Sequence, residues 1–92
     1  MHNIKMFALY DTKANVYDTP VFLMNEVHAK RWFFTMIQRG EGKFEYFKDE
    51  IELHELATFD VLTGKITAKK TILQEGKQIR KEIENNENSD AA

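Results

Sequence analysis

A histidine and a glutamate stand side by side at His54 and Glu55, and they match the first two positions of the H-E-x-x-H zinc-protease pattern. The second histidine of that pattern would fall at position 58, where this chain has Thr58. The pattern needs a helix, because only a helix places residues four apart on one face. Residues 51–60 instead alternate as a β-strand does, so neighbouring side chains point to opposite faces. We therefore predict no zinc site at His54.

The other candidates for chemistry are scattered histidines and an acidic run. His2, His28 and His54 are far apart in the sequence and show no ligand spacing. The acidic run carries no basic residue and consists of Asp49, Glu50, Glu52, Glu55 and Asp60. Charges of this kind commonly keep a sheet edge soluble, and no phosphate-binding glycine loop or nucleophile with its base accompanies them. We predict no catalytic residue, no metal and no cofactor, so we expect the chain not to be an enzyme.

Length and composition indicate one small globular domain. The chain has 92 residues, of which 42% are hydrophobic and 30% charged, with a formal net charge of −2. No apolar run approaches the roughly 20 residues that a membrane-spanning helix needs. The absence of cysteine excludes disulfides and thiolate metal sites, and it suits a cytosolic protein. We expect a single α+β domain over residues 1–84 and a flexible tail over residues 85–92.

Hydrophobic periodicity predicts the elements of this domain. Residues 4–10 carry apolar side chains on both faces, which indicates a strand inside a sheet. A second strand starts at Pro20 or lies on an edge, and Gly64 joins two further strands in a hairpin. On the first of these, one face is expected to hold Ile51, Leu53, Ala57 and Phe59, with Glu55 as the one misfit, which indicates a bulge or an edge position. The expected order is β-β-α-β-β: an antiparallel sheet of about four strands, one long helix packed on it and a short C-terminal helix.

The long helix is the clearest element, with Asn25 as its N-cap and Gly40 as its left-handed C-cap. Its apolar arc spans roughly 200°, which is wider than the usual stripe of about 100°. A small sheet does not obviously cover so wide an arc, and self-association or a partner is one explanation.

Basic and aromatic residues give nucleic-acid binding some support, because single-strand binders combine a basic track with exposed rings on which bases stack. The candidates for phosphate contact and stacking are Lys30, Arg31, Arg39, Lys43, Phe44 and Tyr46. The alternative is that the aromatic side chains belong to the core and the basic ones only solubilise the surface.

Three stretches, in this order, resemble a known family of phage proteins. They are "KMFALYDTKANVYDTPVF" at residues 5–22, "NEVHAKRWF" at residues 25–33 and the hairpin "ELHELATFDVLTGKI" at residues 52–66. Together they resemble the small nonstructural protein of gokushovirus-like microviruses, phages with single-stranded DNA genomes. The resemblance covers roughly residues 5–67. The chain departs from the family's pattern at "FKDE" before Ile51, where a proline-containing P-E-D step is usual.

The resemblance implies an accessory role without catalytic residues. The family is regarded as DNA-binding and is placed in single-stranded genome synthesis or the switch to packaging. We therefore expect a non-enzymatic factor in phage DNA replication or packaging, in the cytoplasm of the bacterial host, that binds single-stranded DNA weakly. The alternative is a protein–protein interaction module that acts on the viral replication initiator, the capsid or a host factor. A homodimer remains open, and no membrane partner is expected.

Overall fold

The structure is a computed structural model that describes the backbone of residues 3–91 and the side chains of residues 3–86. One antiparallel sheet with helices confirms the predicted α+β class. The strands are β1 (Asn3–Asp11), β2 (Val16–Tyr17), β3 (Val21–Leu23), β4 (Ile51–Asp60) and β5 (Ile66–Glu75). The helices are α1 (Glu26–Arg39), α2 (Phe44–Phe47), the 3-10 helix η1 (Lys48–Glu50) and α3 (Gly76–Ala91).

The sheet has five strands where the sequence predicts about four, because residues 16–23 form two short strands instead of one. β2 pairs with the end of β1, and β3, which starts directly after Pro20, pairs with its middle. The main order is β2-β1-β4-β5, so β1 lies inside the sheet as predicted. Gly64 takes a positive φ of 77° in the β4–β5 hairpin, also as predicted.

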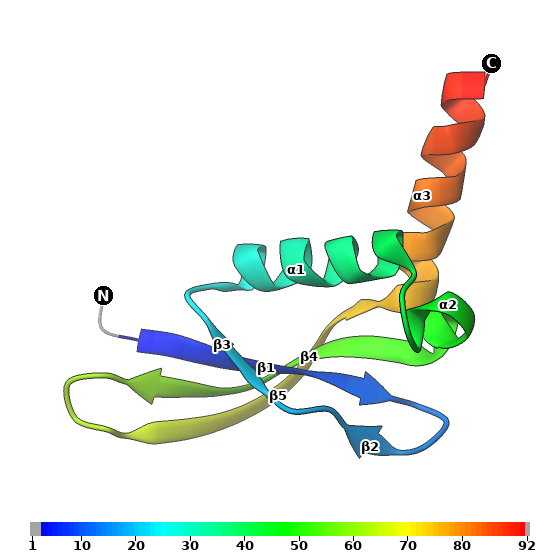
Figure 1. Ribbon diagram of the computed structural model, residues 1–92. Helices are drawn as coiled ribbons and strands as arrows, with labels where there is room; N and C mark the ends of the chain where they lie inside the picture. The colour runs from blue at the N-terminus through cyan, green and yellow to red at the C-terminus, as the bar shows by residue number, and fades with distance from the viewer. Residues whose placement is uncertain (1–2, 92) are drawn as a thin grey trace.

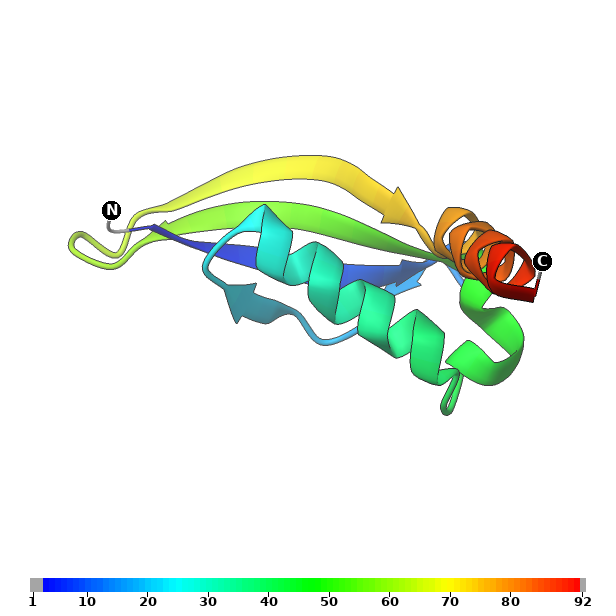
Figure 2. The same cartoon turned by 90° about the horizontal axis from the view of Figure 1, so that it is seen from above.

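The molecule has two layers, with α1 lying along one face of the sheet (Figure 1). Seen from above, the same helix crosses over β1 and β4 (Figure 2). No described helix or strand lies on the opposite face of the sheet. The smallest dimension of the molecule is 19 Å, which leaves room for one sheet and one helix because packed layers lie about 10 Å apart.

Helix α1 begins and ends as the sequence predicts. The Asn25 side chain accepts a hydrogen bond of 2.9 Å from the backbone N–H of His28. Gly40 ends the helix at φ 62°, and its N–H donates to the carbonyl of Met36. The helix face toward the sheet is buried and presents Ala29, Phe33 and Ile37. Local capping and the apolar stripe therefore determine this element almost alone.

The hydrophobic core lies between α1 and the sheet and is closed at one end by α2 and α3. Its members are Phe7, Leu9, Ala29, Phe33, Ile37, Phe44, Ile51, Leu53 and Ile79. Phe44 corrects an expectation, because the sequence places residues 41–50 in a loop with exposed rings. The segment instead turns through α2 and η1, and the Phe44 side chain is only 4% exposed.

A bulge in β4 changes which side chains face the core. Met6 on β1 pairs with Ala57, whereas the next residue, Phe7, pairs with Glu55, so Leu56 is an extra residue in β4. Paired residues point to the same side of a sheet. Strict alternation would have kept Ala57 and Phe59 on the core face with Leu53. Of the two alternatives that Glu55 indicated, a bulge and an edge position, the bulge is present. It moves Ala57 and Phe59 to the opposite face, which corrects that part of the prediction.

Helix α3 begins at Gly76, directly after β5, and rises away from the end of the sheet (Figure 1). Ile79 is buried and Ile83 is half-buried against the core, as expected for two isoleucines four residues apart. The helix is longer than the predicted short one, since it continues to Ala91. The tail predicted over residues 85–92 therefore lies mostly within α3, and Ala92 is outside the described residues.

Candidate functional site

The predicted nucleic-acid residues lie on different parts of the surface. Arg31 and Arg39 are exposed on α1, away from the sheet. Lys30, on the flank of α1, pairs with Glu26 at 3.0 Å, and Lys43, just before α2, forms an ion pair with Asp18. The structure therefore does not gather these basic groups into one track.

The two aromatic candidates have opposite surroundings. Tyr46 is 76% exposed, so its ring is accessible to a partner. Phe44 packs in the core at 4% exposure, so it cannot stack on a base, and the prediction for this residue is wrong. The sequence spacing could not tell Phe44 from Tyr46 in this respect. In a helix of four residues, the tertiary contact alone decides which ring faces the core.

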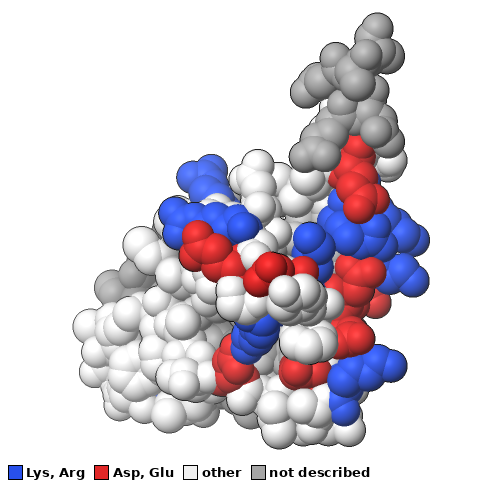
Figure 3. All heavy atoms as spheres, turned by 45° about the vertical axis from the view of Figure 1, so that its right-hand side comes forward, with Lys and Arg blue, Asp and Glu red and all other residues white. Residues whose placement is uncertain are grey.

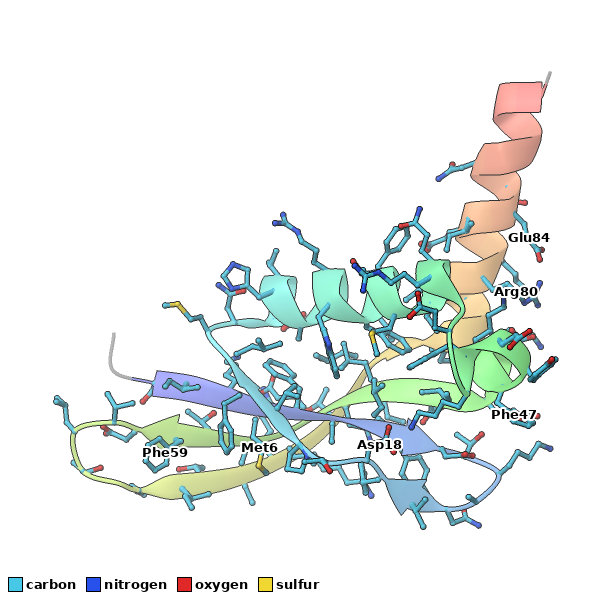
Figure 4. All side chains as sticks on the ribbon, in the orientation of Figure 1. Met6, Asp18, Phe47, Phe59, Arg80 and Glu84 are labelled. Atoms are coloured by element: carbon cyan, nitrogen blue, oxygen red, sulfur yellow. The ribbon has the colours of Figure 1, made fainter. Side chains whose placement is uncertain are left out.

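Charges of both signs alternate over the surface around α2, η1 and α3 (Figure 3). Arg80 there contacts two acids: its Nε lies 2.7 Å from Asp49 Oδ1, and its Nη1 lies 2.9 Å from Glu84 Oε2. Figure 4 shows the Arg80 and Glu84 side chains next to each other on α3. The hydrogen bond from Arg80 lowers the pKa of Asp49 below its ordinary value. This network ties α3 to η1 and is best explained as structural.

The face of the sheet opposite α1 is apolar and uncovered, and we call it the open sheet face. The register assigns to it Ile4, Met6, Ala8, Tyr10, Phe22, Glu52, His54, Ala57, Phe59, Ile66, Ala68, Ile72 and Glu75. Three of its large apolar side chains are more than half exposed: Phe22 at 57%, Ile66 at 68% and Ile72 at 57%. Figure 4 shows Met6 and Phe59 on this side of the sheet. Contiguous exposure of this kind typically marks an interaction surface.

A shallow hollow of about 220 Å³ opens on this face, lined by Ile4, Phe22 and Phe59. Pockets for small molecules usually measure roughly 300–1,000 Å³ and contain a few polar groups that orient the ligand. This hollow is smaller and has only apolar walls. It is therefore suited to one apolar side chain of a macromolecule.

The far end of the open sheet face is polar and centres on His54, which is 2% exposed. His54 Nε2 lies 2.9 Å from the carboxylate of Glu52, and its Nδ1 lies 2.8 Å from the hydroxyl of Tyr17. Because a carboxylate only accepts, Nε2–H donates to Glu52, while the direction of the hydrogen bond between Nδ1 and the Tyr17 hydroxyl follows the proton on the ring. Tyr10 stacks on the imidazole with ring centroids 5.1 Å apart. With both ring nitrogens already bonded and the ring buried, the cluster joins β2 to β4.

Glu55 points to the other face, as the strand prediction requires, and is buried at 2% exposure. Its carboxylate oxygens lie 3.5 Å from Lys5 Nζ and 3.7 Å from Lys69 Nζ. A buried carboxylate needs such partners, since an unpaired charge in the interior is costly. His54 and Glu55 therefore serve separate clusters. Among the side chains of residues 3–86, which the structure describes, no three metal-ligating groups come together as a metal site.

The comparison with protein families gives one match, to the phage ORF5 proteins, over residues 4–79. The chain belongs to this family. The match covers the whole sheet, α1 and the start of α3, so the open sheet face lies within the part that defines a phage ORF5 protein. The comparisons with curated proteins and with solved structures gave no match. Among the described residues, no helix is both long and apolar enough to cross a membrane.

Sequence reasoning missed the open sheet face, although one signal for it was present. The strand at residues 4–10 is apolar on both sides, with Phe7 and Leu9 on one face and Ile4 and Met6 on the other. A strand of this kind predicts cover on both faces. In this structure only one of the two faces is covered, so the second face is available to a partner.

Proposed function

We propose that this phage ORF5 protein is a non-enzymatic accessory protein of the infection cycle that works by protein–protein contact through the open sheet face. The observation that carries this proposal is an apolar sheet face without a covering element. Exposing such side chains to water disfavours the isolated chain by about 25 cal/mol for every Å². A protein partner that covers the face removes this cost. The partner classes are a second copy, the replication initiator, the capsid or a host factor.

The chemistry of the face supports a protein partner over DNA. Binding to a nucleic-acid backbone depends on Lys and Arg near the phosphates, and the residues that define the open sheet face include neither. Lys70, on β5 beside this face, lies over the Tyr17 ring at 5.8 Å. Glu52 and Glu75 stand at the same end of the face and would repel phosphate. The exposed groups include aliphatic side chains such as Ile66 and Ile72, which pack against apolar protein surfaces but offer no ring for stacking.

Two matched substitutions of an exposed phenylalanine test the proposal. Phe22→Ser alters the open sheet face, and Phe34→Ser alters the outer side of α1, where the ring is 36% exposed. The wild-type protein is titrated against the purified replication initiator and capsid protein of its phage, and its self-association is measured in parallel. We expect Phe22→Ser to weaken at least one protein contact tenfold or more, because a buried aromatic ring contributes about 1.5–3 kcal/mol. Phe34→Ser should leave that contact unchanged.

Two results would contradict this function. One is that every protein contact found is insensitive to Phe22→Ser. The other is that single-stranded DNA binds and that Phe22→Ser abolishes this binding, which would make the open sheet face a nucleic-acid platform.

Weak binding of single-stranded DNA is a second candidate function, and it has its own observation. Tyr46 and Phe47 are 76% and 50% exposed next to each other on α2, with Lys43 and Lys48 at the two ends of that helix. Exposed rings beside basic groups can stack bases and contact phosphates. Lys30, Arg31 and Arg39 on α1 would supply further phosphate contacts.

A fluorescence anisotropy titration with a labelled oligo-dT at low salt tests this candidate. Weak binding should be reduced by Tyr46→Ala, which removes the ring, and should fall steeply with added salt because bound counterions are released. Phe22→Ser is the control and should bind as the wild type does. No binding at protein concentrations of several hundred micromolar, on the order of the weak non-specific limit, removes the candidate.

A further inference from the structure

We infer that the occupant of the open sheet face is a second copy of this chain, packed face to face about a twofold axis. The result would be a four-layer dimer in which two sheets form the centre and the two α1 helices lie outside. This inference rests on the proposed function, because it names the partner of the same face. It is argued from the area, the shape and the charge of that face.

The exposed area is enough for a dimer of modest affinity. Large apolar side chains expose roughly 150–250 Å² when free, so Phe22, Ile66 and Ile72 at more than half exposure offer about 300 Å². The half-buried Ile4, Met6 and Phe59, together with Tyr17 at 36%, raise this to about 500 Å². Two copies would bury about 1,000 Å² of apolar surface, which is about the minimum for a biological interface and is typical of weak, transient contacts.

The overall dimensions agree with a molecule that has an uncovered side. The accessible surface is 6390 Å², whereas a monomer of this mass typically exposes about 5,500 Å². The radius of gyration is 14.8 Å, compared with about 12.3 Å for a compact chain of this length. The projecting α3 contributes to both differences (Figure 1), and a sheet that carries a helix layer on one side only would contribute in the same direction.

The shape of the face suits a twofold contact. Such a contact is self-complementary, so projection and recess must be present on the same surface. Phe22 and Ile66 project from the face, and the hollow beside Phe59 receives one apolar side chain. Between them, Ala57 and Ala68 pair across β4 and β5 and add little bulk. Small residues at the centre allow a second sheet to approach to the usual spacing of about 10 Å.

The charge pattern also permits self-pairing. The half of the face built from Ile4, Met6, Phe22, Phe59 and Ile66 carries no charged side chain among the described residues. A twofold contact centred on this half brings no like charges together there and leaves Glu52 and Glu75, at the other end of the face, nearer its rim. A partner with a charged surface would have its charged groups left unpaired against this uncharged half of the face. A membrane surface would require basic residues around the face, and this half has none among the residues that define it.

Dimerisation through the free edge of β5, by strand pairing between two copies, is disfavoured. β5 is the outer strand and leaves one backbone edge free. Its middle carries Lys69 and Lys70, and its register to β4 shifts twice, between Leu53 and His54 and between Glu55 and Ala57. Charged side chains and bulges are the usual means by which proteins prevent edge-to-edge pairing. The face, not the edge, is therefore the contact.

Sedimentation equilibrium of the full chain over about 1–300 µM tests the inference, because interfaces at the low end of the size range bind weakly and a dissociation constant on the order of micromolar or above is expected. Ile66→Lys places a charge on the open sheet face at a side chain that is 68% exposed. Val27→Lys is the matched control on the outer side of α1, where the side chain is 63% exposed. We expect Ile66→Lys to raise the dissociation constant at least tenfold and Val27→Lys to leave it unchanged. Far-UV circular dichroism establishes that both variants are folded.

A second measurement leaves the large apolar residues of the face intact. The chain has no cysteine, so Ala68→Cys introduces a single thiol on the open sheet face and Val27→Cys a single thiol on α1. A bismaleimide that spans about 10 Å, the spacing of packed sheets, should link Ala68→Cys into dimers and leave Val27→Cys monomeric. This readout does not depend on whether Ile66→Lys folds.

The outcomes separate the inference from the proposed function. A dimer that Ile66→Lys weakens and Ala68→Cys traps supports both. A chain that stays monomeric to several hundred micromolar, on the order of a hundred times the expected constant, overturns the inference, as does a dimer lost with Val27→Lys and kept with Ile66→Lys. If the chain is a monomer that binds a phage protein, and Phe22→Ser abolishes that binding, the dimer inference is wrong and the proposed function stands. If no protein contact depends on Phe22, the dimer inference and the proposed function are both wrong.

Discussion

The two faces of the sheet are built by the same strands but have different neighbours. On the covered face, Phe7 and Leu53 lie under Phe33 of α1 and are fully buried. On the open sheet face, Phe22 and Ile66 remain more than half exposed. The residue types on the two faces are similar, so apolar composition alone does not tell which face is the core. The number of covering elements decides, and in the described part of this chain only α1 lies along the sheet, on one of its two apolar faces.

The comparison separates stability from binding. Side chains on the covered face should determine the free energy of unfolding, because removing them leaves cavities. Side chains on the open sheet face should contribute little to the folding of an isolated chain and more to its association. The predictions below test that separation.

The largest effect is expected from a pair of phenylalanines on neighbouring strands. Phe7→Ala on the covered face should lower the free energy of unfolding by about 3–5 kcal/mol, since Phe7 is 0% exposed. Phe22→Ala on the open sheet face should lower it by less than about 1 kcal/mol. Urea denaturation at low micromolar protein, where a dimer contributes least, provides both values. Equal losses for the two variants would mean that the two faces do not differ in the way we describe.

The sequence predicted this division only in part. Asn25 and Gly40 bracket α1, and Gly64 adopts the positive φ that its hairpin needs, because these features depend on neighbouring residues alone. The burial of Phe44 depends on where α2 meets the core, which no local pattern encodes.

The bulge limits prediction of the candidate site in a similar way. Glu55 signalled an irregularity, but the position of the extra residue, Leu56, follows from pairing with β1. That single residue moves Ala57 and Phe59 onto the open sheet face. Whether any face stays uncovered is a property of the complete fold, so the open sheet face could not be read from spacing.

A glycine at the end of the covered side should show the next largest effect. A Cβ at Gly76 would lie 1.9 Å from the carbonyl oxygen of Lys48, so Gly76→Ala must displace backbone where α3 meets η1. We expect a loss of at least about 2 kcal/mol. Gly42→Ala is the control: its φ is 58° and no atom lies within 4 Å, so only the cost of positive φ, about 1 kcal/mol, applies. Thermal denaturation followed by circular dichroism compares them. A smaller loss for Gly76→Ala than for Gly42→Ala would refute the close contact with η1.

The covered face contains one buried charge, and a double-mutant cycle tests how it is stabilised. Lys5→Met removes the nearer cation from Glu55 and should cost about 1–3 kcal/mol, because a buried carboxylate loses part of its compensation. Glu55→Gln in the same background should recover part of that loss. Urea denaturation of the four proteins measures the coupling. If the losses from Lys5→Met and Glu55→Gln simply add, Lys69 and water already compensate the charge of Glu55 and Lys5 is dispensable.

The smallest effect is expected at Asp49, which belongs to neither face and fixes α3 through Arg80. The carboxylate is 43% exposed and solvent-screened, so Asp49→Asn should lower the melting temperature by no more than about 4 °C. The hydrogen bond from Arg80 lowers the pKa of Asp49 in the folded protein. Its contribution is therefore present above the ordinary pKa of 3.8 and is lost as the pH falls through the lower folded value. Wild type and Asp49→Asn should differ at pH 7 and converge in acid below pH 3.8. A difference that persists unchanged at pH 2, about two units below that value, would mean that Asp49 acts through packing and not through its charge.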